Sequence, residues 1–380
     1  MKVIIAIDSF KGSLSSIQAG NAVKDAILRV DNNANVIVKP LADGGEGTVD
    51  ALSSGFDSEI IELAVNGPLL KSVNAKYCIL KDTNTAVIEM AAASGITLIS
   101  DEERNPLFTT TYGVGELIKD AIKRGCRRFI VGIGGSATND GGTGMLNALG
   151  FEFLDKNNNP IAYGAIGLKD LFIIKTDNVI SEFKECIFNI ACDVTNPLCG
   201  EKGCSAVFAP QKGATPEMIK DMDAWLSNYA EIAKTISSNA DKDYKGAGAA
   251  GGLGFAFLSF TNATLKSGIE IVLEETKIEN DIKEADIVVT GEGRLDSQTV
   301  MGKAPIGVAR LAKKYGKKVI AFSGCVTEDA EACNEHGIDA YFPIVRGITA
   351  LEEALNTDNA YKNLVATAYQ VFRIITSEKE

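Results

Sequence analysis

An apolar, β-branched run that ends in a polar loop and leads into a helical pattern recurs at both ends of this chain. The apolar run at residues 3–7 stops at Asp8, and a helical pattern follows over residues 17–30. Residues 35–42 begin a second repeat of this kind, and the alternation returns from Ala285 to the C-terminus. Alternating strands and helices are typical of a doubly wound parallel sheet, so the predicted fold class is α/β.

The middle of the chain follows a different pattern. Between residues 60 and 89, short alternating runs are separated by NGP and DTN turns, which is typical of antiparallel strands. We therefore predict two domains for the 380 residues. Residues 1–62 and 285–380 are expected to form a discontinuous, Rossmann-like domain with a doubly wound parallel sheet, and residues 63–284 an inserted, mixed α/β domain.

Glycine is concentrated in the segment FIVGIGGSATNDGGTGM, which begins with an apolar run at Phe129. Six of the thirteen residues from Gly132 to Gly144 are glycine, and hydroxyl, amide and carboxylate side chains stand between them. Glycine backbone approaches a ligand closely, and successive N–H groups in such a turn form a nest for anionic oxygens. The segment predicts a ligand-binding loop, and a tight strand-to-helix turn without a ligand is the alternative.

The same segment also fits the spacing G-x-G-x-x-A of a dinucleotide-binding turn, through Gly132, Gly134 and Ala137. That fingerprint opens a helix at once, whereas here TNDGG separates it from the helical pattern MLNAL. A nicotinamide-dependent oxidoreductase that acts on a small hydroxy acid is therefore a less favoured alternative. A non-catalytic nucleotide-binding regulator is a third.

Charge and composition argue against several classes of function. The net charge of −12 and the pI near 4.9 disfavour binding to nucleic acid or to an anionic membrane, which needs a basic surface. No apolar run approaches about 18 residues, so no membrane span is expected. A single histidine, His336, argues against a serine or cysteine triad and a histidine-rich metal site, and it is expected to be a helix cap or a surface residue. The eight cysteines form no C-x-x-C pair, which favours reduced thiols and a cytoplasmic location.

Five loops pair glycine with a carboxylate at the C-terminal end of a predicted strand, the edge at which open α/β sheets bind ligands. They lie at residues 8–12, 43–46, 134–142, 193–200 and 291–296. Glycine N–H groups suit phosphate oxygens, and carboxylates suit a Mg²⁺ ion or accept a proton from an attacking hydroxyl. Positive charge near such loops would come from Lys11, Lys212 and Lys303. Since the chain has no P-loop string and no protein-kinase motif set, any phosphoryl transfer at these loops would use a different architecture.

In its motifs the chain resembles the bacterial glycerate kinase family of the first type. The matching strings span nearly the whole chain in family order: DSFKGSLSS (8–16), ADGGEGT (42–48), GIGGSATNDGG (132–142), ACDVTNPLCG (191–200), FAPQKGA (208–214), GAGAAGGLG (246–254), TGEGRLDSQT (290–299) and GKAPIGVA (302–309). The resemblance implies phosphorylation of D-glycerate by ATP and Mg²⁺ to 2-phospho-D-glycerate, with the active site between two α/β domains. The 3-phosphoglycerate product is the alternative, and the chain is expected to act as a monomer or homodimer.

The resemblance leaves the roles of individual residues open, and we assign them from their chemistry. Asp193 and Asp296 are predicted to bind the metal or to activate the hydroxyl, and Lys11 is predicted to offset phosphate or carboxylate charge. The nucleotide is expected at Gly134, Gly135, Ser136, Thr138, Asn139, Gly291, Glu292 and Gly293. Glycerate is expected at Asp8, Ser9, Asp43, Gly44, Gly45 and Glu46, and the two acidic residues of the 43–46 loop are alternative metal ligands.

Overall fold

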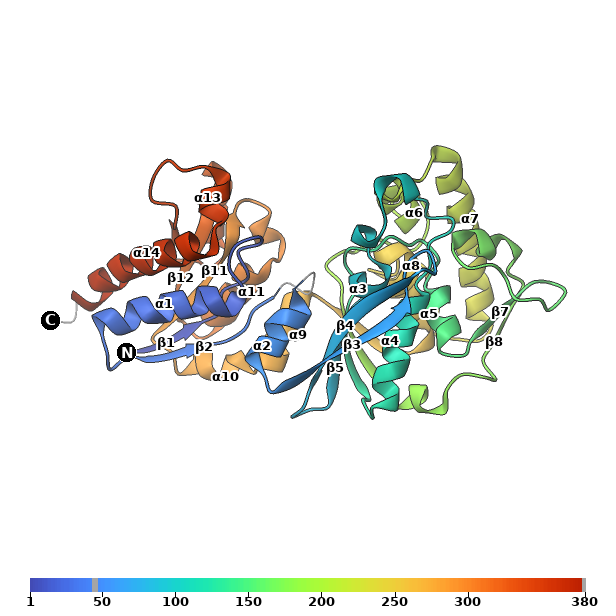
Figure 1. Ribbon diagram of the computed structural model, residues 1–380, viewed down its shortest axis with the longest axis horizontal. Helices are drawn as coiled ribbons and strands as arrows, with labels where there is room; N and C mark the ends of the chain where they lie inside the picture. Colours follow the sequence, from blue (N-terminus) through green and yellow to red (C-terminus); the bar gives the residue numbers. More distant parts are fainter. Residues whose placement is uncertain (43–46, 378–380) are drawn as a thin grey trace. The chain divides into compact units, whose positions relative to one another are not determined.

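The computed structural model of the protein describes residues 1–42 and 47–377. Its contacts divide the chain into two compact units. The first unit comprises Met1–Asp43, Asp50–Phe56 and Ile269–Glu380, and the second comprises Gly44–Val49 and Asp57–Gly268. Both ends of the chain therefore contribute to the first unit, and a long central segment forms most of the second (Figure 1).

The second unit begins and ends earlier in the chain than the predicted inserted segment 63–284. Strand β3 (Ser58–Asn66) pairs along its whole length with β4 (Ser72–Leu80), so the second sheet starts before residue 63. Helices α9 (Gly268–Thr276) and α10 (Ile278–Lys283) fall almost entirely in the first unit. The predicted boundary at residue 285 was placed where the next strand pattern begins. Since α9 and α10 precede that strand, the pattern did not show that they belong to the first unit.

The first unit contains a five-stranded parallel sheet with the strand order β13-β12-β11-β1-β2. Its strands are β1 (Lys2–Ile5), β2 (Asn35–Val38), β11 (Ile287–Leu295), β12 (Lys318–Val326) and β13 (Ala340–Pro343). The chain passes from β1 outward to β2 and later returns to β11 on the opposite side of β1. The strand order therefore reverses between β1 and β11, which is where open α/β sheets bind ligands.

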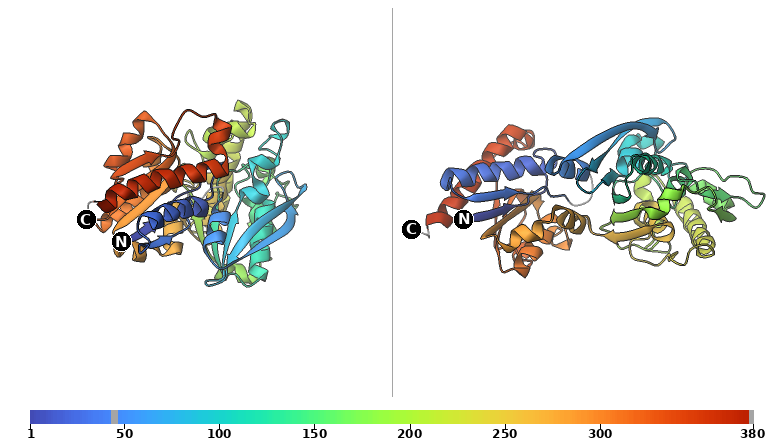
Figure 2. Two further views of the ribbon diagram at one scale, coloured as in Figure 1. Left: turned by 60° about the vertical axis from the view of Figure 1, so that its left-hand side comes forward. Right: turned by 90° about the horizontal axis from the view of Figure 1, so that it is seen from below.

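Helices cover both faces of this sheet, as the doubly wound prediction requires (Figures 1 and 2). On one face α1 (Ser16–Val30) packs beside α14 (Thr357–Ser377), and their apolar side chains join those of the strands in one core. α11 (Ala304–Lys314) contacts β11 and β12, and α10 contacts α11. A capping box fixes the start of α1, because the backbone N–H of Gln18 donates to Ser15 Oγ and that of Ser15 donates to Gln18 Oε1.

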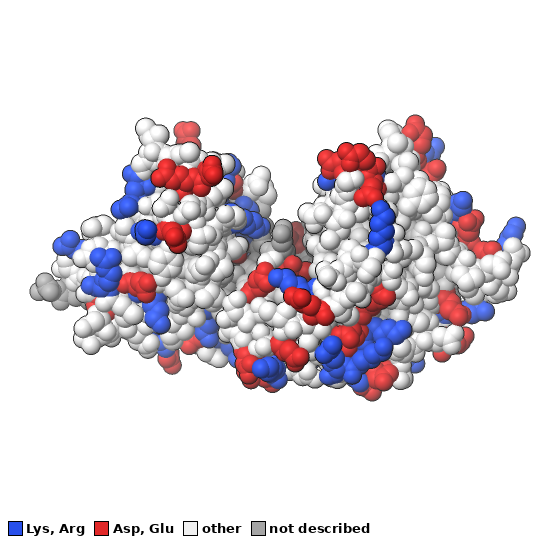
Figure 3. Space-filling view, in the orientation of Figure 1, with Lys and Arg blue, Asp and Glu red and all other residues white. Residues whose placement is uncertain are grey.

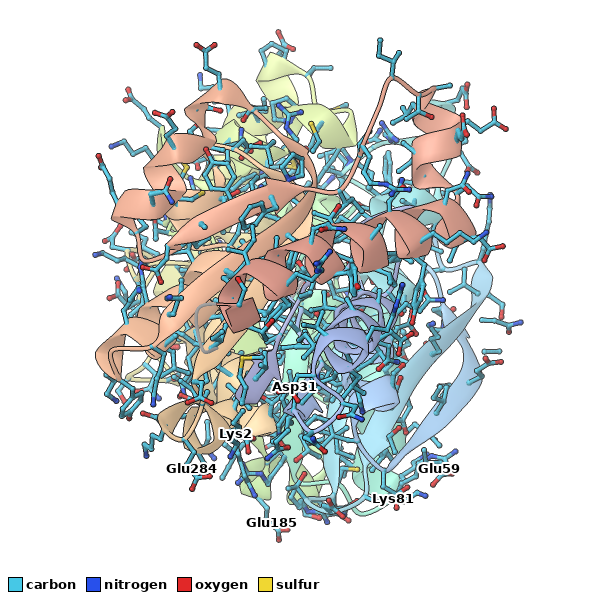
Figure 4. The ribbon with its side chains drawn as sticks, turned by 90° about the vertical axis from the view of Figure 1, so that its left-hand side faces the viewer. Lys2, Asp31, Glu59, Lys81, Glu185 and Glu284 are labelled. Atoms are coloured by element: carbon cyan, nitrogen blue, oxygen red, sulfur yellow. The ribbon has the colours of Figure 1, made fainter. Side chains whose placement is uncertain are left out.

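An ion pair joins two distant parts of the chain within the first unit. Lys2 Nζ donates to Glu284 Oε2 at 2.7 Å, and the Lys2 backbone N–H donates to Asp286 Oδ2 at 2.7 Å. Figure 4 shows Lys2 and Glu284 close together. Because Glu284 is exposed, the ion pair itself contributes little, and the parallel pairing of β1 with β11 makes the main connection.

The second unit contains a six-stranded mixed sheet with the order β10-β9-β6-β5-β4-β3. β3, β4 and β5 (Thr85–Glu89) pair antiparallel, as the alternating runs predicted. β5 then begins a parallel half, which continues through β6 (Arg128–Gly132), β9 (Ile187–Ala191) and β10 (Asn262–Lys266). The helices that contribute most to its core are α4 (Tyr112–Lys123), α5 (Thr143–Ala148), α7 (Pro216–Lys234) and α8 (Ala249–Phe260).

Further short helices are distributed over both units. They are α2 (Thr48–Gly55), α3 (Ala91–Ser94), α6 (Cys204–Phe208), α12 (Ala332–Glu335) and α13 (Leu351–Leu355).

The segment FEFLDKNNNPIA (residues 151–162) forms only part of a hairpin. Leu154 forms an isolated bridge with Pro160, so the NNNP turn does reverse the chain. Strand β7 (Glu152–Leu154), however, pairs antiparallel with β8 (Ile173–Lys175) rather than with the residues directly after the turn. β8 is the partner because Ile174, further along the chain, places a buried apolar side chain opposite Phe153.

The predicted loop at residues 291–296 is a strand over most of its length. β11 continues to Leu295 in parallel register with β12, and Gly291 lies opposite Phe322. A Cβ atom on Gly291 would lie 2.0 Å from the carbonyl oxygen of Phe322. Close approach of two strands therefore explains this glycine, which composition alone had suggested was a loop residue.

No helix within residues 1–42 and 47–377 combines the length and the apolar character needed to cross a membrane. On the face shown in Figure 3, Lys and Arg side chains are interspersed with Asp and Glu side chains. Positive charge at a ligand site of this acidic chain therefore comes from individually placed side chains.

Candidate active site

The first pocket is a cavity of about 430 Å³ in the first unit, at the point where the strand order reverses. Asp8, Ser9 and Lys11 reach it from the segment after β1, and Glu292 and Gly293 reach it from β11. β1 and β11 are parallel neighbours, so their carboxyl ends lie at one edge of the sheet. The sequence predicted all five residues as site residues but assigned them to different ligands.

Two carboxylates of the first unit flank a single ammonium group. Lys303 Nζ lies 3.8 Å from Glu292 Oε2 and 3.7 Å from Asp296 Oδ1. Thr299 Oγ1 donates to Glu292 Oε1 at 2.7 Å, and Arg294 Nε lies 3.2 Å from Asp296 Oδ2. Because both carboxylates approach the same nitrogen atom, they are near neighbours whose mutual repulsion the cation offsets.

Glu292 and Asp296 fit a metal that is shared between the protein and a ligand. Mg²⁺ beside phosphates is held by one or two carboxylates, and phosphate oxygens and water complete its coordination shell. Among the described residues, no group of three or more His, Cys, Asp or Glu side chains could hold a metal by itself. A Mg²⁺ ion at Glu292 and Asp296 would therefore need ligand oxygens.

The opposite wall of the first pocket is apolar. It consists of Ile344, Val345, Leu351, Ala354 and Leu355, which lie after β13 and in α13. Leu351 is 74% exposed and Val345 is 36% exposed, so this wall is largely uncovered in the protein alone. The sequence prediction missed it, because apolar residues of a short helix cannot be distinguished from core residues by pattern.

The second pocket is a cavity of about 250 Å³ in the second unit, at the carboxyl ends of β6 and β9. Gly134, Gly135 and Ser136 follow β6, and Asp193 follows β9. These two strands are parallel neighbours, so the loops that follow them meet at one edge of the sheet. The structure thus brings together four predicted site residues that come from two separate motifs.

Asp193 and the glycines of the second pocket are accessible to a ligand. Asp193 is exposed, and its Oδ1 accepts a hydrogen bond from the backbone N–H of Gly268 at 3.2 Å. Gly134 and Gly135 are also exposed. Asp193 is therefore an exposed carboxylate at the second pocket that a backbone N–H helps to hold.

Lys212 lines the second pocket with a side chain that is almost completely buried. It is 2% exposed, and its Nζ donates to Ser136 Oγ at 2.7 Å and to the carbonyl oxygen of Thr138 at 2.6 Å. Burial lowers the pKa of the Lys212 ammonium to about 8. The sequence indicated Lys212 only as a source of positive charge, and it gave no sign of this burial.

Thr138 and Asn139 lie behind the second pocket rather than on its surface. Both are fully buried, and Asn139 Nδ2 donates to Ser205 Oγ at 2.9 Å. Asp140 is also fully buried, and it accepts bonds from the N–H and hydroxyl of Thr111 at 2.8 and 2.9 Å. Burial raises the pKa of Asp140, and these hydrogen bonds oppose that shift. The three residues therefore fix the shape of the glycine loop from behind.

A second glycine segment interlocks with this loop. The backbone N–H of Gly141 donates to the carbonyl oxygen of Gly251 at 2.9 Å, and a Cβ atom on Gly251 would lie 2.1 Å from the carbonyl oxygen of Thr138. Ala250, which lines the pocket, has φ +53° and ψ +41°, an unfavourable conformation for alanine. α5 begins only at Thr143, so the turn at 132–137 does not open a helix as a dinucleotide fingerprint does.

The predicted site residues are therefore divided between the two units. Asp296 and Lys11 lie in the first unit, and Asp193 lies in the second. Gly291 is buried within β11 and does not line the first pocket. The predicted residues Asp43, Gly44, Gly45 and Glu46 lie outside the described residues.

Comparison with known proteins gives a consistent result along the whole chain. The glycerate kinase family model matches residues 3–376. A glycerate kinase of Haemophilus influenzae is 48% identical over 375 residues, 99% of each chain, and a glycerate 2-kinase of Escherichia coli is 46% identical over 372 residues, 97% of this chain and 98% of its own. A crystal structure of a candidate glycerate kinase 2 from Salmonella typhimurium LT2 superposes with a TM-score of 0.93 at 45% identity, and covers 100% of this chain and 99% of that one. The chain is therefore an enzyme of the glycerate kinase family.

Proposed function

We propose that the chain transfers the γ-phosphoryl group of ATP to D-glycerate in the presence of Mg²⁺, with 2-phospho-D-glycerate and ADP as products. The observation that carries the proposal is the grouping of Glu292, Asp296 and Lys303 beside Lys11 and Arg294, where the first sheet reverses its strand order. Carboxylates and cations in one pocket suit a nucleotide whose phosphates carry a divalent metal. Membership of the family supports glycerate as the acceptor.

Glu292, which lines the first pocket, and Asp296, which contacts the lining residue Lys303, are proposed to hold Mg²⁺. The bound ion would offset negative charge on the phosphate oxygens. Lys11 adds a second positive charge, and Gly293 leaves room for a phosphate close to the backbone, because no side chain projects from it. Asp8 is proposed to accept hydrogen bonds from the hydroxyl groups of glycerate, with its Oδ1 held by the N–H of Ser9 at 2.7 Å.

In the second pocket, Gly134, Gly135 and Ser136 are proposed to receive anionic oxygens through their N–H and hydroxyl groups. Asp193 is proposed to accept the proton of the attacking hydroxyl, and metal binding is its alternative role. Exposure supports either role, since a proton acceptor must reach the substrate. Thr138 and Asn139 are proposed to act from behind, by holding the loop.

The 2-hydroxyl is the proposed acceptor, and the 3-hydroxyl is the alternative. The supporting observation is the 46% identity over 372 residues to a protein named as a glycerate 2-kinase. An enolase-coupled assay without phosphoglycerate mutase separates the two products, because enolase accepts 2-phosphoglycerate directly. A signal that appears only after mutase is added would assign the product as the 3-isomer.

The first experiment is ADP release by the purified chain with ATP, D-glycerate and a range of Mg²⁺ concentrations. We expect ADP release that depends on both glycerate and Mg²⁺. A rate that is unchanged when glycerate is omitted would refute the proposed function. Short hydroxy acids other than glycerate, tested in parallel, define the acceptor range.

The proposal includes a cytoplasmic location and activity as a monomer or homodimer. All eight cysteines are free thiols, and five of them are buried, which supports a reducing compartment. Sedimentation of the active enzyme over a range of concentrations measures the assembly state. A larger assembly in the active fraction would contradict this part of the proposal.

A further inference from the structure

Lys212 presents an unusual electrostatic situation in the second unit. Its side chain is 2% exposed, yet no salt bridge joins it to a carboxylate within the described part of the chain. An isolated ammonium group is costly to bury, and buried charges in proteins are normally paired. The two acceptors that Nζ does have, Ser136 Oγ and the Thr138 carbonyl oxygen, are both uncharged. The buried carboxylate of Asp140 acts on Lys212 without bonding to it, so among the described residues the ammonium group has no anion in direct contact.

The second pocket is where such a partner can bind. Lys212 lines the cavity of about 250 Å³ together with Gly134, Gly135 and Ser136. An ammonium group has three N–H donors, and two of them are used by Ser136 and Thr138. Asp193, the one carboxylate that lines the cavity, forms no salt bridge with Lys212 among the described residues and is held by the N–H of Gly268. One donor of the ammonium group thus remains for a ligand.

We propose that Lys212, Gly134, Gly135 and Ser136 form a preformed oxyanion site that takes a carboxylate or a phosphoryl group. The inference rests on the proposed function, because glycerate supplies the first group and ATP the second. A ligand oxygen would receive the free N–H of Lys212 and the N–H groups of the exposed glycines. The bound anion would also place a negative charge in direct contact with the buried ammonium group.

The surroundings of Lys212 hold it in place before any ligand arrives. Lys212 ends a short 3-10 helix, Pro210–Lys212, whose last turn is closed by a bond from the N–H of Gly213 to the carbonyl oxygen of Pro210 at 3.0 Å. Its Nζ in turn ties down both Ser136 and Thr138. Binding an anion therefore requires little ordering of side chains, which reduces its entropic cost.

The test compares Lys212→Met with the control Lys220→Met, which removes an exposed ammonium group from α7. Isothermal titration of the full chain measures binding of D-glycerate and, separately, of a non-hydrolysable ATP analogue with Mg²⁺. We expect Lys212→Met to weaken at least one of these ligands by about 10- to 100-fold, the usual effect of a lost charged hydrogen bond, and Lys220→Met to weaken neither.

The pattern of loss identifies the source of the oxyanion. Loss of glycerate binding alone assigns the site to the carboxylate, loss of analogue binding alone assigns it to a phosphoryl group, and loss of both shows that the two ligands share it. Unchanged affinity for both ligands in a folded Lys212→Met variant overturns the inference. Inorganic phosphate, titrated in the same way, separates this result from the proposed function. Phosphate binding that depends on Lys212 supports the oxyanion site even if the chain does not phosphorylate glycerate.

A measurement on the unmodified chain keeps the inference testable if Lys212→Met does not fold. Glycerol has the hydroxyl groups of glycerate but no carboxylate, so it should bind at least about tenfold more weakly than D-glycerate if the carboxylate occupies the site. Inorganic phosphate should compete with D-glycerate or with the ATP analogue, whichever occupies it. Equal binding of glycerol and D-glycerate, with no competition by phosphate against either ligand, overturns the inference.

Discussion

The first and second pockets hold positive charge in opposite ways. In the first pocket, the side chain of Lys303 is 35% exposed and lies between the carboxylates of Glu292 and Asp296. In the second pocket, Lys212 is 2% exposed and has only uncharged acceptors. The first arrangement suits a ligand that brings both a metal and phosphates, because cations and carboxylates are both present. The second suits direct contact with an anion.

The walls of the two pockets also differ in polarity and size. One side of the first pocket is apolar and extends to the exposed residue Leu351, so a flat apolar group could cover it. The second pocket is smaller, about 250 Å³ against about 430 Å³, and much of its polar surface is glycine backbone. The comparison suggests a nucleotide-sized ligand in the first pocket and a small anionic group in the second.

The largest expected effect comes from removing the predicted catalytic carboxylates. Asp296→Asn and Asp193→Asn each keep the side-chain volume but remove a charge that would bind the metal or accept a proton. We expect kcat to fall roughly 10²-fold or more in each variant, with little change in the midpoint of thermal unfolding. ADP-release kinetics and a thermal melt measure the two quantities.

Glu335→Gln is the matched control for the charge change, because Glu335 is exposed at the end of α12 and lines neither pocket. Its kcat should equal that of the unmodified chain. If both aspartate variants also kept normal kcat, the two carboxylates would have structural roles only. The difference between the pockets would then not reflect a difference in catalytic roles.

The next effect is a pH dependence that only the second pocket should show. Burial lowers the pKa of Lys212 to about 8, and the Coulombic interactions with Cys204 and Asp140 act in the opposite direction. An anion needs the protonated ammonium, so its affinity should be constant below pH 8 and fall up to about tenfold per pH unit above it. Raising the pH has the opposite effect on the contribution of Lys212 to folding stability. Between this pKa and the ordinary value of 10.5, the unfolded chain binds more protons, so the Lys212 contribution to stability rises with pH.

Titration of the oxyanion between pH 7 and pH 9.5, by calorimetry, checks this dependence. Asp193 also lines the second pocket, so the same titration is run with Lys212→Met. Lys212→Met should remove the break in affinity near pH 8. A break of equal size in that variant would show that another group controls the titration.

A smaller effect is expected from filling the apolar wall of the first pocket. Ala354→Phe adds a ring where Ala354 lines the cavity, and we expect the KM for ATP to rise by about fivefold while the KM for glycerate stays constant. Glu352→Phe adds the same ring at an exposed position of α13 that does not line the cavity. Equal KM values for ATP in the two variants would show that the nucleotide does not bind against this wall.

The parts of this protein that local residues determine could be predicted from the sequence. The parallel strands around β1 and β11 follow from their apolar runs, and glycine beside polar side chains indicated the loops at 8–12 and 134–136 that line the two pockets. Residue 291 shows the limit of that signal, since its glycine serves strand packing against Phe322. Local composition does not distinguish a glycine that a ligand requires from one that a neighbouring strand requires.

Features that depend on distant parts of the chain could not be predicted. Lys212 follows Ser136 by 76 positions, and only the folded second unit shows that the two side chains bond and that the ammonium group is buried. The apolar wall at Leu351 and Ala354 likewise becomes part of a site only when α13 lies at the first pocket. In both cases the decisive quantity is burial, or its absence, which sequence pattern does not report.

The smallest expected effect concerns backbone strain, which the second pocket contains at Ala250. Its left-handed conformation, φ +53° and ψ +41°, costs an alanine about 1–2 kcal/mol, and glycine adopts it without that cost. Glycine also gains entropy in the unfolded chain, which returns about 0.4–1 kcal/mol, so Ala250→Gly should stabilise folding by about 0.5 kcal/mol. Ala249→Gly, one residue earlier, should instead destabilise by about 0.4–1 kcal/mol, because Ala249 has no left-handed conformation to relieve and glycine only adds entropy to the unfolded chain. Urea unfolding of both variants measures the difference. If Ala250→Gly were as destabilising as Ala249→Gly, the methyl group at 250 would contribute packing that outweighs its strain, and the second pocket would be less strained than its dihedral angles indicate.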